Sequence, residues 1–258
     1  MKTTGNTILI TGGGSGIGLA LAEEFSKLGN KVIVAARSAR KLELAAGKGL
    51  QQLPVNMSSR ESIESLARTV VTRFPALNVV IHNAGIMKNE NLRTSNTSDI
   101  AVETIATNLA GPILLTTALL PHLLEQADAT IMTVSSGLAF VPLAMNPTYS
   151  ATKAAIHSYT QSLRYQLQGT SIRVLELVPP YVQTELMGSR GLHDPAAMPL
   201  GQFIAEVMAI LKSQPRVSEI LVKRVLPLRF AASDGPDKYA AVYQEMNDRV
   251  SAARAQEF

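Results

Sequence analysis

The chain has 258 residues, of which 46% are hydrophobic and 17% charged, and its formal net charge is +4. This composition is typical of a well-buried globular protein, and the length favours one large core, so residues 1–258 are predicted to form a single domain. With no cysteine and four dispersed histidines we expect no metal site, and scattered basic residues with 5% aromatics argue against nucleic-acid binding.

The sequence also argues against membrane contact. No apolar stretch is long and uninterrupted enough to span a bilayer. The residues from Met1 to Asn6 lack the apolar core of a signal peptide and lead directly into a predicted strand. We therefore expect a cytoplasmic protein.

Short apolar segments alternate with longer amphipathic ones along the chain. Strands are predicted at 7–11, 31–35, 51–55, 78–82, 129–134, 171–177 and 217–225, and helices at 16–28, 39–46, 60–74, 99–126, 149–168 and 237–255. Because the strands are apolar on both faces, this order predicts an α/β fold of three layers, a doubly wound Rossmann fold with a mostly parallel sheet of roughly seven strands. The looser composition after residue 186 predicts a flap over 186–213 that covers the substrate.

In such sheets ligands bind beyond the carboxyl ends of the strands, so the residues that follow each strand are the first candidates for a functional site. The first strand is followed by the sequence Thr-Gly-Gly-Gly-Ser-Gly-Ile-Gly. Glycine permits positive φ and close approach of the backbone, so free N–H groups at a helix N-terminus can hold a pyrophosphate. The glycine spacing departs from the general dinucleotide fingerprint and resembles the Thr-Gly-x-x-x-Gly-x-Gly motif of the short-chain dehydrogenase/reductase family. By this resemblance the cofactor phosphates contact Gly12, Ser15, Gly16, Ile17 and Gly18.

The end of the second strand bears on the choice of cofactor. An enzyme that uses NAD needs an acidic side chain here for the ribose hydroxyls, but this chain has Ala36 and Arg37. A guanidinium would pair with a 2′-phosphate, so Arg37, helped by Ser38 and Arg40, favours NADP(H). Many NADP-preferring relatives carry a basic residue at the position of Ser15, so a second phosphate-binding group is missing and use of NAD(H) stays open.

Two further segments resemble family elements that line the adenosine part of the cofactor. Asn56 follows the third strand, where the resemblance implies an adenine contact. After the fourth strand, His82 precedes Asn83, Ala84 and Gly85, a segment similar to the family's Asn-Asn-Ala-Gly, which steadies the sheet and lines the adenine ribose. His82 replaces the common asparagine.

Tyr149 and Lys153 form a Tyr-x-x-x-Lys element at the start of a predicted helix. Their spacing of four puts both side chains on one face of the helix. A nearby ammonium stabilises a phenolate and lowers its pKa from about 10, so we expect Tyr149 to act as a general acid or base. Such a pair is common on helix surfaces, and the assignment depends on the motifs around it.

Ser136 lies just after the fifth strand, 13 residues before Tyr149, a spacing that resembles that of the family's catalytic serine; Ser135 is the alternative. Asn108 lies in a segment similar to the family's Asn-x-x-Gly element and would complete an Asn-Ser-Tyr-Lys tetrad. The resemblance implies that Ser136 binds the substrate oxygen and that Asn108 holds a water in a proton relay to Lys153. Alternatively, Asn108 is a polar residue beside a helix irregularity. Tyr149 and Lys153 would also contact the cofactor.

After the sixth strand, the segment from Pro179 to Thr184 resembles the family's Pro-Gly-x-Val-x-Thr, whose valine and threonine touch the nicotinamide carboxamide. Val182 and Thr184 inherit this contact. The substrate is expected to bind Ser136, Leu138, Phe140, Tyr181 and Met187. Because these side chains offer no strong anion-binding group, we expect a small or medium hydrophobic carbonyl compound.

The resemblance runs from Thr7 to about Leu186. It implies an oxidoreductase that moves a hydride between NADP(H) and an alcohol or carbonyl substrate, with Tyr149 as general acid/base, in a homodimer or homotetramer. A catalytically silent NADP(H)-binding sensor or scaffold is the alternative, and an epimerase or dehydratase of the extended branch is another. The complete tetrad favours the oxidoreductase.

Overall fold

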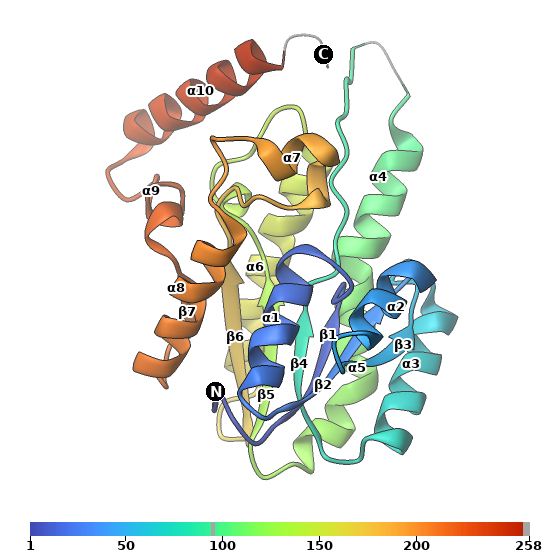
Figure 1. Ribbon diagram of the computed structural model, residues 1–258. Coiled ribbons are helices and arrows are strands. Elements are labelled where there is room, and N and C mark those ends of the chain that lie inside the picture. The colour runs from blue at the N-terminus through green and yellow to red at the C-terminus, as the bar shows by residue number, and fades with distance from the viewer. Residues whose placement is uncertain (94–95, 255–258) are drawn as a thin grey trace.

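The computed structural model describes residues 1–93 and 96–254, which form three layers around one sheet (Figure 1). Within these residues seven strands pair in the order β3-β2-β1-β4-β5-β6-β7, and every pair is parallel. The strands are β1 Thr7–Thr11, β2 Lys31–Ala36, β3 Gln51–Pro54, β4 Leu77–His82, β5 Ala129–Val134, β6 Ile172–Val178 and β7 Glu219–Leu221. The predicted doubly wound α/β fold is confirmed.

The helices lie on both faces of the sheet. The longer ones are α1 Gly16–Lys27, α2 Ala39–Ala46, α3 Arg60–Arg73, α4 Ser98–Ile105, α5 Gly111–Leu124, α6 Pro147–Gln166, α8 Leu200–Ser213 and α10 Pro236–Ala253, and the short ones are α7 Ser189–His193 and α9 Leu226–Arg229. Buried side chains of α1, α2 and α8 pack on one face, and those of α3, α5 and α6 pack on the other.

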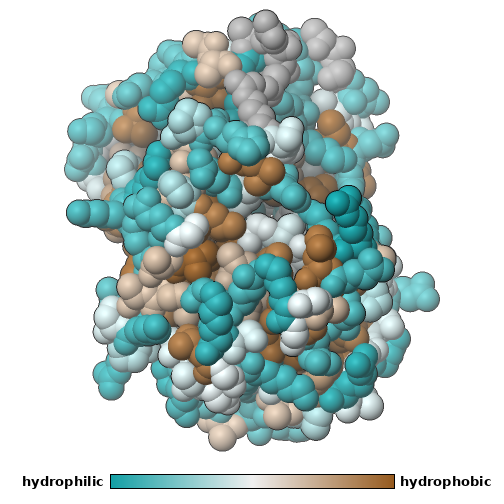
Figure 2. All heavy atoms as spheres, in the orientation of Figure 1, coloured by the Kyte–Doolittle hydropathy of each residue, from teal (hydrophilic) through white to brown (hydrophobic). Residues whose placement is uncertain are grey.

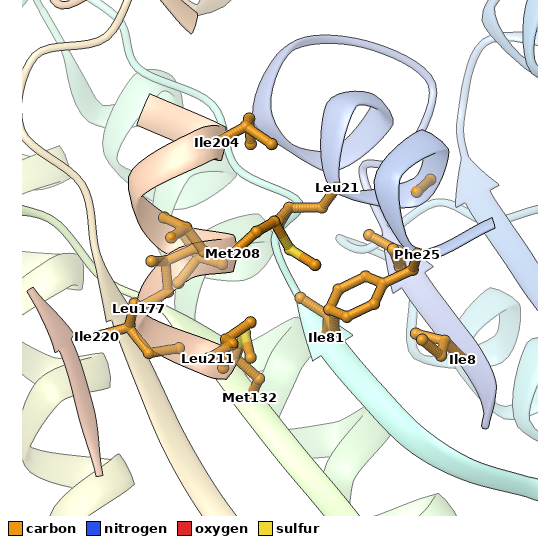
Figure 3. Packing of buried hydrophobic residues seen from close by; sticks show 14 of the residues in the cluster. Ile8, Leu21, Phe25, Ile81, Met132, Leu177, Ile204, Met208, Leu211 and Ile220 are labelled. Carbon is orange, nitrogen blue, oxygen red and sulfur yellow. The ribbon is translucent and has the colours of Figure 1, made fainter. Parts of the chain in front are cut away.

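The strands are buried on both faces because their side chains alternate between two cores. Ile8 and Ile10 of β1 belong to the core under α1 and α8, whereas Leu9 belongs to the core under α3 and α5. Figure 3 shows the first core, where Phe25 of α1 lies beside Ile8. Each fully buried side chain of this size contributes about 1.5–3 kcal/mol to folding, so continuous apolar strands are what this architecture requires. On the surface, hydrophilic residues separate smaller hydrophobic patches on the face that Figure 2 shows.

Two predicted elements differ from the structure. The helix expected at 99–126 is divided into α4 and α5 by a π-helical segment, Ala106–Ala110. The edge strand expected at 217–225 is limited to β7, because β6 ends at Val178, the partner of Leu221, and leaves the following residues without a strand to pair with. The C-terminal helix expected at 237–255 is observed as α10, and residue 255 lies outside the described residues.

Part of the segment that was predicted to cover the substrate is a core helix. Of the flap predicted over 186–213, residues 200–213 form α8, whose apolar face is buried in the core. The segment that could cover a substrate is thereby narrowed to 186–199.

The helical stretch Ser98–Leu124 is long and apolar enough to cross a membrane, by length and composition alone. Leu115, Leu119 and Leu123 of this stretch are buried in the core, so it is a core helix of the fold.

His82 ends β4 inside the core, and its Nε2 lies 2.9 Å from the Thr116 hydroxyl. Its Nδ1 is buried and has no hydrogen-bond partner among the described residues. Burial lowers the pKa of His82 from 6.5 to about 4, because the charged ring cannot be solvated there. The fold therefore favours the neutral imidazole.

This shift makes stability depend on pH in a defined window. The pKa of His82 is lower in the folded state than in the unfolded state, so the unfolded state binds the proton first as the pH falls. The contribution of the neutral imidazole to stability is therefore complete above about pH 6.5 and is lost as the pH falls toward 4. Between about pH 7.5 and about pH 4.5 we expect the wild type to lose about 2–3 kcal/mol more unfolding free energy than His82→Asn. Urea unfolding of both proteins at the two pH values measures this difference, and equal losses would show that the folded protein accommodates the imidazolium.

Candidate active site

The glycine-rich turn between β1 and α1 packs directly against the segment that follows β4. Gly12 has φ +66°, and a Cβ at this position would lie 2.7 Å from the Ala84 Cα. A Cβ on Gly18 would lie 2.4 Å from Asn83 Nδ2 and 2.6 Å from the Gly12 carbonyl oxygen. The turn can therefore hold no side chain at these two positions, which leaves its backbone accessible at the start of α1.

Hydrogen bonds lock the same two segments together. Asn83 Nδ2 donates to the carbonyl oxygens of Thr11 and Gly12 at 3.1 and 3.2 Å. The backbone N–H groups of Asn83 and Ala84 both donate to the Thr11 hydroxyl at 3.2 Å. The structure thus brings Gly12, Gly18, Asn83 and Ala84 together at the point where the strand order reverses between β1 and β4.

Two basic side chains flank the glycine-rich turn. Arg37 follows β2 with 67% of its side chain exposed, and its guanidinium lies 3.5 Å from the Glu103 carboxylate. Lys41 of α2 donates to the Ser15 hydroxyl at 3.0 Å and pairs with Glu185 at 2.8 Å. Lys41 therefore places an ammonium beside Ser15, where the sequence itself has no basic residue.

Other predicted cofactor residues have local structural partners. The Ser38 hydroxyl accepts a hydrogen bond from Lys41 N and so caps α2. The side-chain oxygen of Asn56 accepts from the N–H and hydroxyl of Ser58, which fixes the loop after β3. A Cβ at Gly16 would lie 3.4 Å from Thr184, so Thr184 borders the glycine-rich turn.

Tyr149, Lys153 and Ser136 meet at the carboxyl end of β5. Lys153 Nζ donates to the Val134 carbonyl at 2.8 Å and lies 5.5 Å from the centroid of the Tyr149 ring. A hydrogen bond joins Ser136 to the Tyr149 side chain. The neighbouring Ser135 has a buried hydroxyl without a partner among the described residues, so Ser136 is the serine that belongs to this group.

Burial controls the protonation of both titratable groups. It raises the pKa of Tyr149 to about 12, although the hydrogen bond with Ser136 acts in the other direction. It lowers the pKa of Lys153 to about 8, and the charge of Glu176 opposes this change. The predicted lowering of the Tyr149 pKa by Lys153 is not found in this structure, where burial and Ser136 are the causes that act on this group.

Asn108 lies in the π-helical segment and is buried. Its Oδ1 accepts from Ile86 N and its Nδ2 donates to the Ile86 carbonyl, both at 2.9 Å. A Cβ on Gly85 would lie 3.4 Å from Asn108 Oδ1 and 3.8 Å from Lys153 Nζ, so these groups also meet. The irregularity considered as an alternative is present and is what carries Asn108 to the tetrad; π-bulges are frequent at functional sites. Its binding of a water stays a prediction.

The predicted substrate residues divide into two groups. Tyr181 and Met187 lie close together in the segment after β6, where both contact Arg254, and Leu138 packs in the apolar cluster beneath α10. The Phe140 ring instead packs edge-on against His157 at 4.7 Å and under the Arg229 guanidinium at 4.6 Å. Val182 is buried and forms a bridge with Met198, which anchors this segment to the core.

Sequence analysis missed Arg254, which lies at the end of α10 with only 8% of its surface exposed. Its guanidinium contacts the Met187 and Met145 sulfurs at 3.5 and 3.7 Å and the Tyr181 hydroxyl at 3.5 Å, and it lies 4.0 Å from Asp194. The expectation that the substrate residues offer no strong anion-binding group did not consider Arg254; it stays a prediction, because Arg254 is buried and already contacts these side chains and Asp194. No local motif in the C-terminal helix could have indicated this contact, because it joins residues from distant parts of the chain.

Glu90 is a second missed residue. Its buried carboxylate accepts hydrogen bonds from Thr148 N at 3.0 Å and from the Thr148 hydroxyl at 2.7 Å. A carboxylate at a helix N-terminus is stabilised by the unpaired N–H groups there. Glu90 thereby fixes the start of α6, one residue before Tyr149.

The sequence predicts no metal, yet one cluster contains metal-binding residue types. Ligand atoms of His157, Glu176 and Glu219 lie within 4.8 Å of one another. His157 Nδ1 is 2.8 Å from a Glu176 oxygen, and Glu219 pairs with Arg229 at 2.7 Å. Because protein partners already bind these groups, we interpret the cluster as a network of ion pairs and hydrogen bonds.

Comparisons with known proteins agree with this geometry. The short chain dehydrogenase family model matches residues 6–194. The chain is 43% identical over 194 residues to an uncharacterized oxidoreductase, DltE, of Bacillus subtilis (strain 168), covering 72% of this chain and 75% of that protein. It superposes on a 3-ketoacyl-(acyl-carrier-protein) reductase from Brucella melitensis complexed with NADH, with a TM-score of 0.75, 26% identity and coverage of 84% and 96%. An alcohol dehydrogenase from Thermococcus sibiricus complexed with 5-hydroxy-NADP gives a TM-score of 0.76, 25% identity and coverage of 85% and 97%.

The packing of the glycine-rich turn leads to a test of stability. We expect Gly18→Ala to lower the unfolding free energy by about 2–4 kcal/mol, because the methyl group would overlap Asn83 and the Gly12 carbonyl. Gly201→Ala is the control: Gly201 lies in α8 with no atom within 4 Å of an added Cβ, so its change should stay within about 1 kcal/mol. Urea unfolding measures both, and equal stability of the two variants would show that the turn can relax to admit a side chain.

Proposed function

The chain belongs to the short-chain dehydrogenase family of NAD(P)-binding oxidoreductases, and we propose that it transfers a hydride between NADP(H) and the carbonyl or alcohol carbon of a small-molecule substrate. The gathering of Tyr149, Ser136 and Lys153 beside the glycine-rich turn carries this proposal. These three side chains supply a proton donor, a hydrogen-bonding hydroxyl and a positive charge that could act together on one carbonyl group.

The residues of the turn fit a dinucleotide. The cradle at Gly12 and Gly18 excludes side chains, and Ser15 begins α1 without a side-chain cap, so backbone N–H groups are free for the phosphates. Gly12, Ser15, Gly16, Ile17 and Gly18 would hold the pyrophosphate, Asn56, Asn83, Ala84 and Gly85 the adenosine part, and Tyr149, Lys153, Val182 and Thr184 the nicotinamide part.

Two cations support NADP(H) over NAD(H). Arg37 follows β2 and Lys41 bonds to Ser15 in the glycine-rich turn, so both would be available to pair with a 2′-phosphate, and Ala36 leaves this strand end without a carboxylate. The solved relatives hold NADH in one case and 5-hydroxy-NADP in the other, so the preference for NADP(H) is argued from these residues.

The bound nicotinamide would supply the hydride for the carbonyl carbon. Tyr149, protonated at neutral pH with its pKa near 12, would donate its proton to the carbonyl oxygen, and Ser136 would hydrogen-bond to the same oxygen. Lys153 would stabilise the phenolate that remains. Asn108, buried beside Gly85 and Lys153, would connect this group to a proton supply.

The substrate that we propose is a small or medium carbonyl compound. Leu138, Tyr181 and Met187 would give it a largely apolar wall, and Arg254, which contacts Tyr181 and Met187 and lies 4.0 Å from Asp194, would add one cation. We also propose a cytoplasmic homodimer or homotetramer that pairs through α4, α5 and α6. Exposed apolar side chains on these helices, including Val102 and Ile105, support this arrangement.

The cofactor assignment is tested by fluorescence titration with NADPH and NADH. We expect the wild type to bind NADPH at least about 10-fold more tightly, Arg37→Asp to reverse this preference, and Lys41→Met to reduce it about 3–10-fold, because each removes a partner of the 2′-phosphate. Lys48→Met is the matched control, since Lys48 pairs with Glu23 away from Ser15. Equal affinity of the wild type for both cofactors would contradict the assignment.

The reaction is tested by NADPH turnover on a panel of aldehydes and ketones, including carboxylate-bearing members because of Arg254. We expect Tyr149→Phe to lower kcat by a factor on the order of 1,000 or more while NADPH binding is retained. The wild-type rate should fall as the pH rises through about 8, where Lys153 loses its charge. Binding of NADPH without turnover on any carbonyl would favour the sensor or scaffold.

A further inference from the structure

Behind the catalytic lysine lies a carboxylate for which the reaction as described has no use. Glu176 is completely buried in the middle of β6, where its backbone pairs with Thr133 of β5 and Glu219 of β7. An isolated charge in such a position costs several kcal/mol, and an apolar residue would serve the core as well or better. Its presence therefore calls for an explanation beyond packing.

Two partners on α6 face this carboxylate. His157 Nδ1 lies 2.8 and 3.0 Å from the two Glu176 oxygens. His157 follows Lys153 by four residues, so both side chains project from the same face of α6 toward the sheet. Lys153 Nζ donates to the carbonyl of Val134, the residue after Thr133, and Thr133 pairs with Glu176. The charge of Glu176 acts on Lys153 from this neighbouring position and raises its pKa against the larger effect of burial.

Further charged groups surround the pair on its outer side. Glu219 of β7 pairs with Arg229 of α9 at 2.7 and 3.0 Å, and Arg164 of α6 also acts on Glu219. Thr133, the neighbour on β5, is uncharged and bonds to Thr160. Glu219 therefore already has cationic partners, and Glu176 is the anion that acts on Lys153.

We propose that Glu176 and His157 are positioning residues for Lys153: the buried carboxylate holds the ammonium charged beside Tyr149, and His157 holds the carboxylate. The reaction that this arrangement would serve is the proposed carbonyl reduction, on which the functional part of the inference rests. The effect of Glu176 on the charge of Lys153 does not depend on that reaction. An ammonium with one backbone carbonyl as its acceptor would lose its proton more easily without this anion behind it.

The inference is tested with Glu176→Gln, which keeps the shape of the side chain and removes its charge. NMR titration of lysine labelled at Cε, with the Lys153 signal identified by its loss in Lys153→Arg, measures the protonation of Lys153 directly. We expect the midpoint to fall by about one pH unit in Glu176→Gln. Glu219→Gln is the matched control, since it removes a carboxylate of the same cluster that pairs with Arg229, and it should shift the midpoint by less than about 0.3. An unchanged midpoint in Glu176→Gln would overturn the proposal.

Turnover separates this inference from the proposed function. For a carbonyl that the wild type reduces, the alkaline limb of kcat/KM should move to lower pH by the same amount in Glu176→Gln, while a merely structural role would lower the rate equally at every pH. If Glu176→Gln does not fold, His157→Gln replaces it and should move the midpoint in the same direction. A shifted Lys153 midpoint in a protein that reduces no carbonyl would refute the proposed function and leave the electrostatic inference standing.

Discussion

The candidate site depends on one constraint, the burial of a charged lysine. Lys153 has only 5% of its surface exposed, and burial alone disfavours its ammonium form. The fold compensates in two ways: the Val134 carbonyl at the end of β5 accepts a hydrogen bond from the ammonium, and the charge of Glu176 in β6 favours the ammonium form. Elements distant in sequence must therefore assemble before this residue can take part in chemistry.

The same burial sets the resting state of the tyrosine. A phenol that remains protonated well above neutral pH keeps its proton available for transfer, and Lys153, which does not lower the resting pKa of Tyr149, lies 5.5 Å from the centroid of its ring. Burial thus disfavours the charged form of both groups, the phenolate of Tyr149 and the ammonium of Lys153. In the proposed reaction, both groups would stabilise the charge that develops on the substrate oxygen.

The sequence predicted the fold and named most residues of the candidate site because its signals are local. Apolar strands buried on both faces indicate a parallel sheet, and the glycine spacing, the Tyr-x-x-x-Lys element and the serine after β5 each lie within a short segment. Contacts between distant segments could not be predicted in this way. Arg254 reaches Tyr181 and Met187 from the end of α10, Lys41 reaches Ser15 from the next helix, and Glu90 reaches the start of α6. The irregularity between α4 and α5 was considered only as an alternative at Asn108, and one continuous helix was predicted, because no glycine or proline precedes the π-helical segment within α4.

The central claim is that the protein transfers a hydride from NADPH to a carbonyl carbon. Its most direct test uses NADPH carrying deuterium at C4 of the nicotinamide, incubated with the protein and a carbonyl panel, followed by mass spectrometry of the alcohols formed. The account predicts an alcohol with one deuterium on its carbinol carbon, formed by the wild type and not by Tyr149→Phe. NADPH that is bound and stays unoxidised, or is oxidised without deuterium in any alcohol, would contradict it.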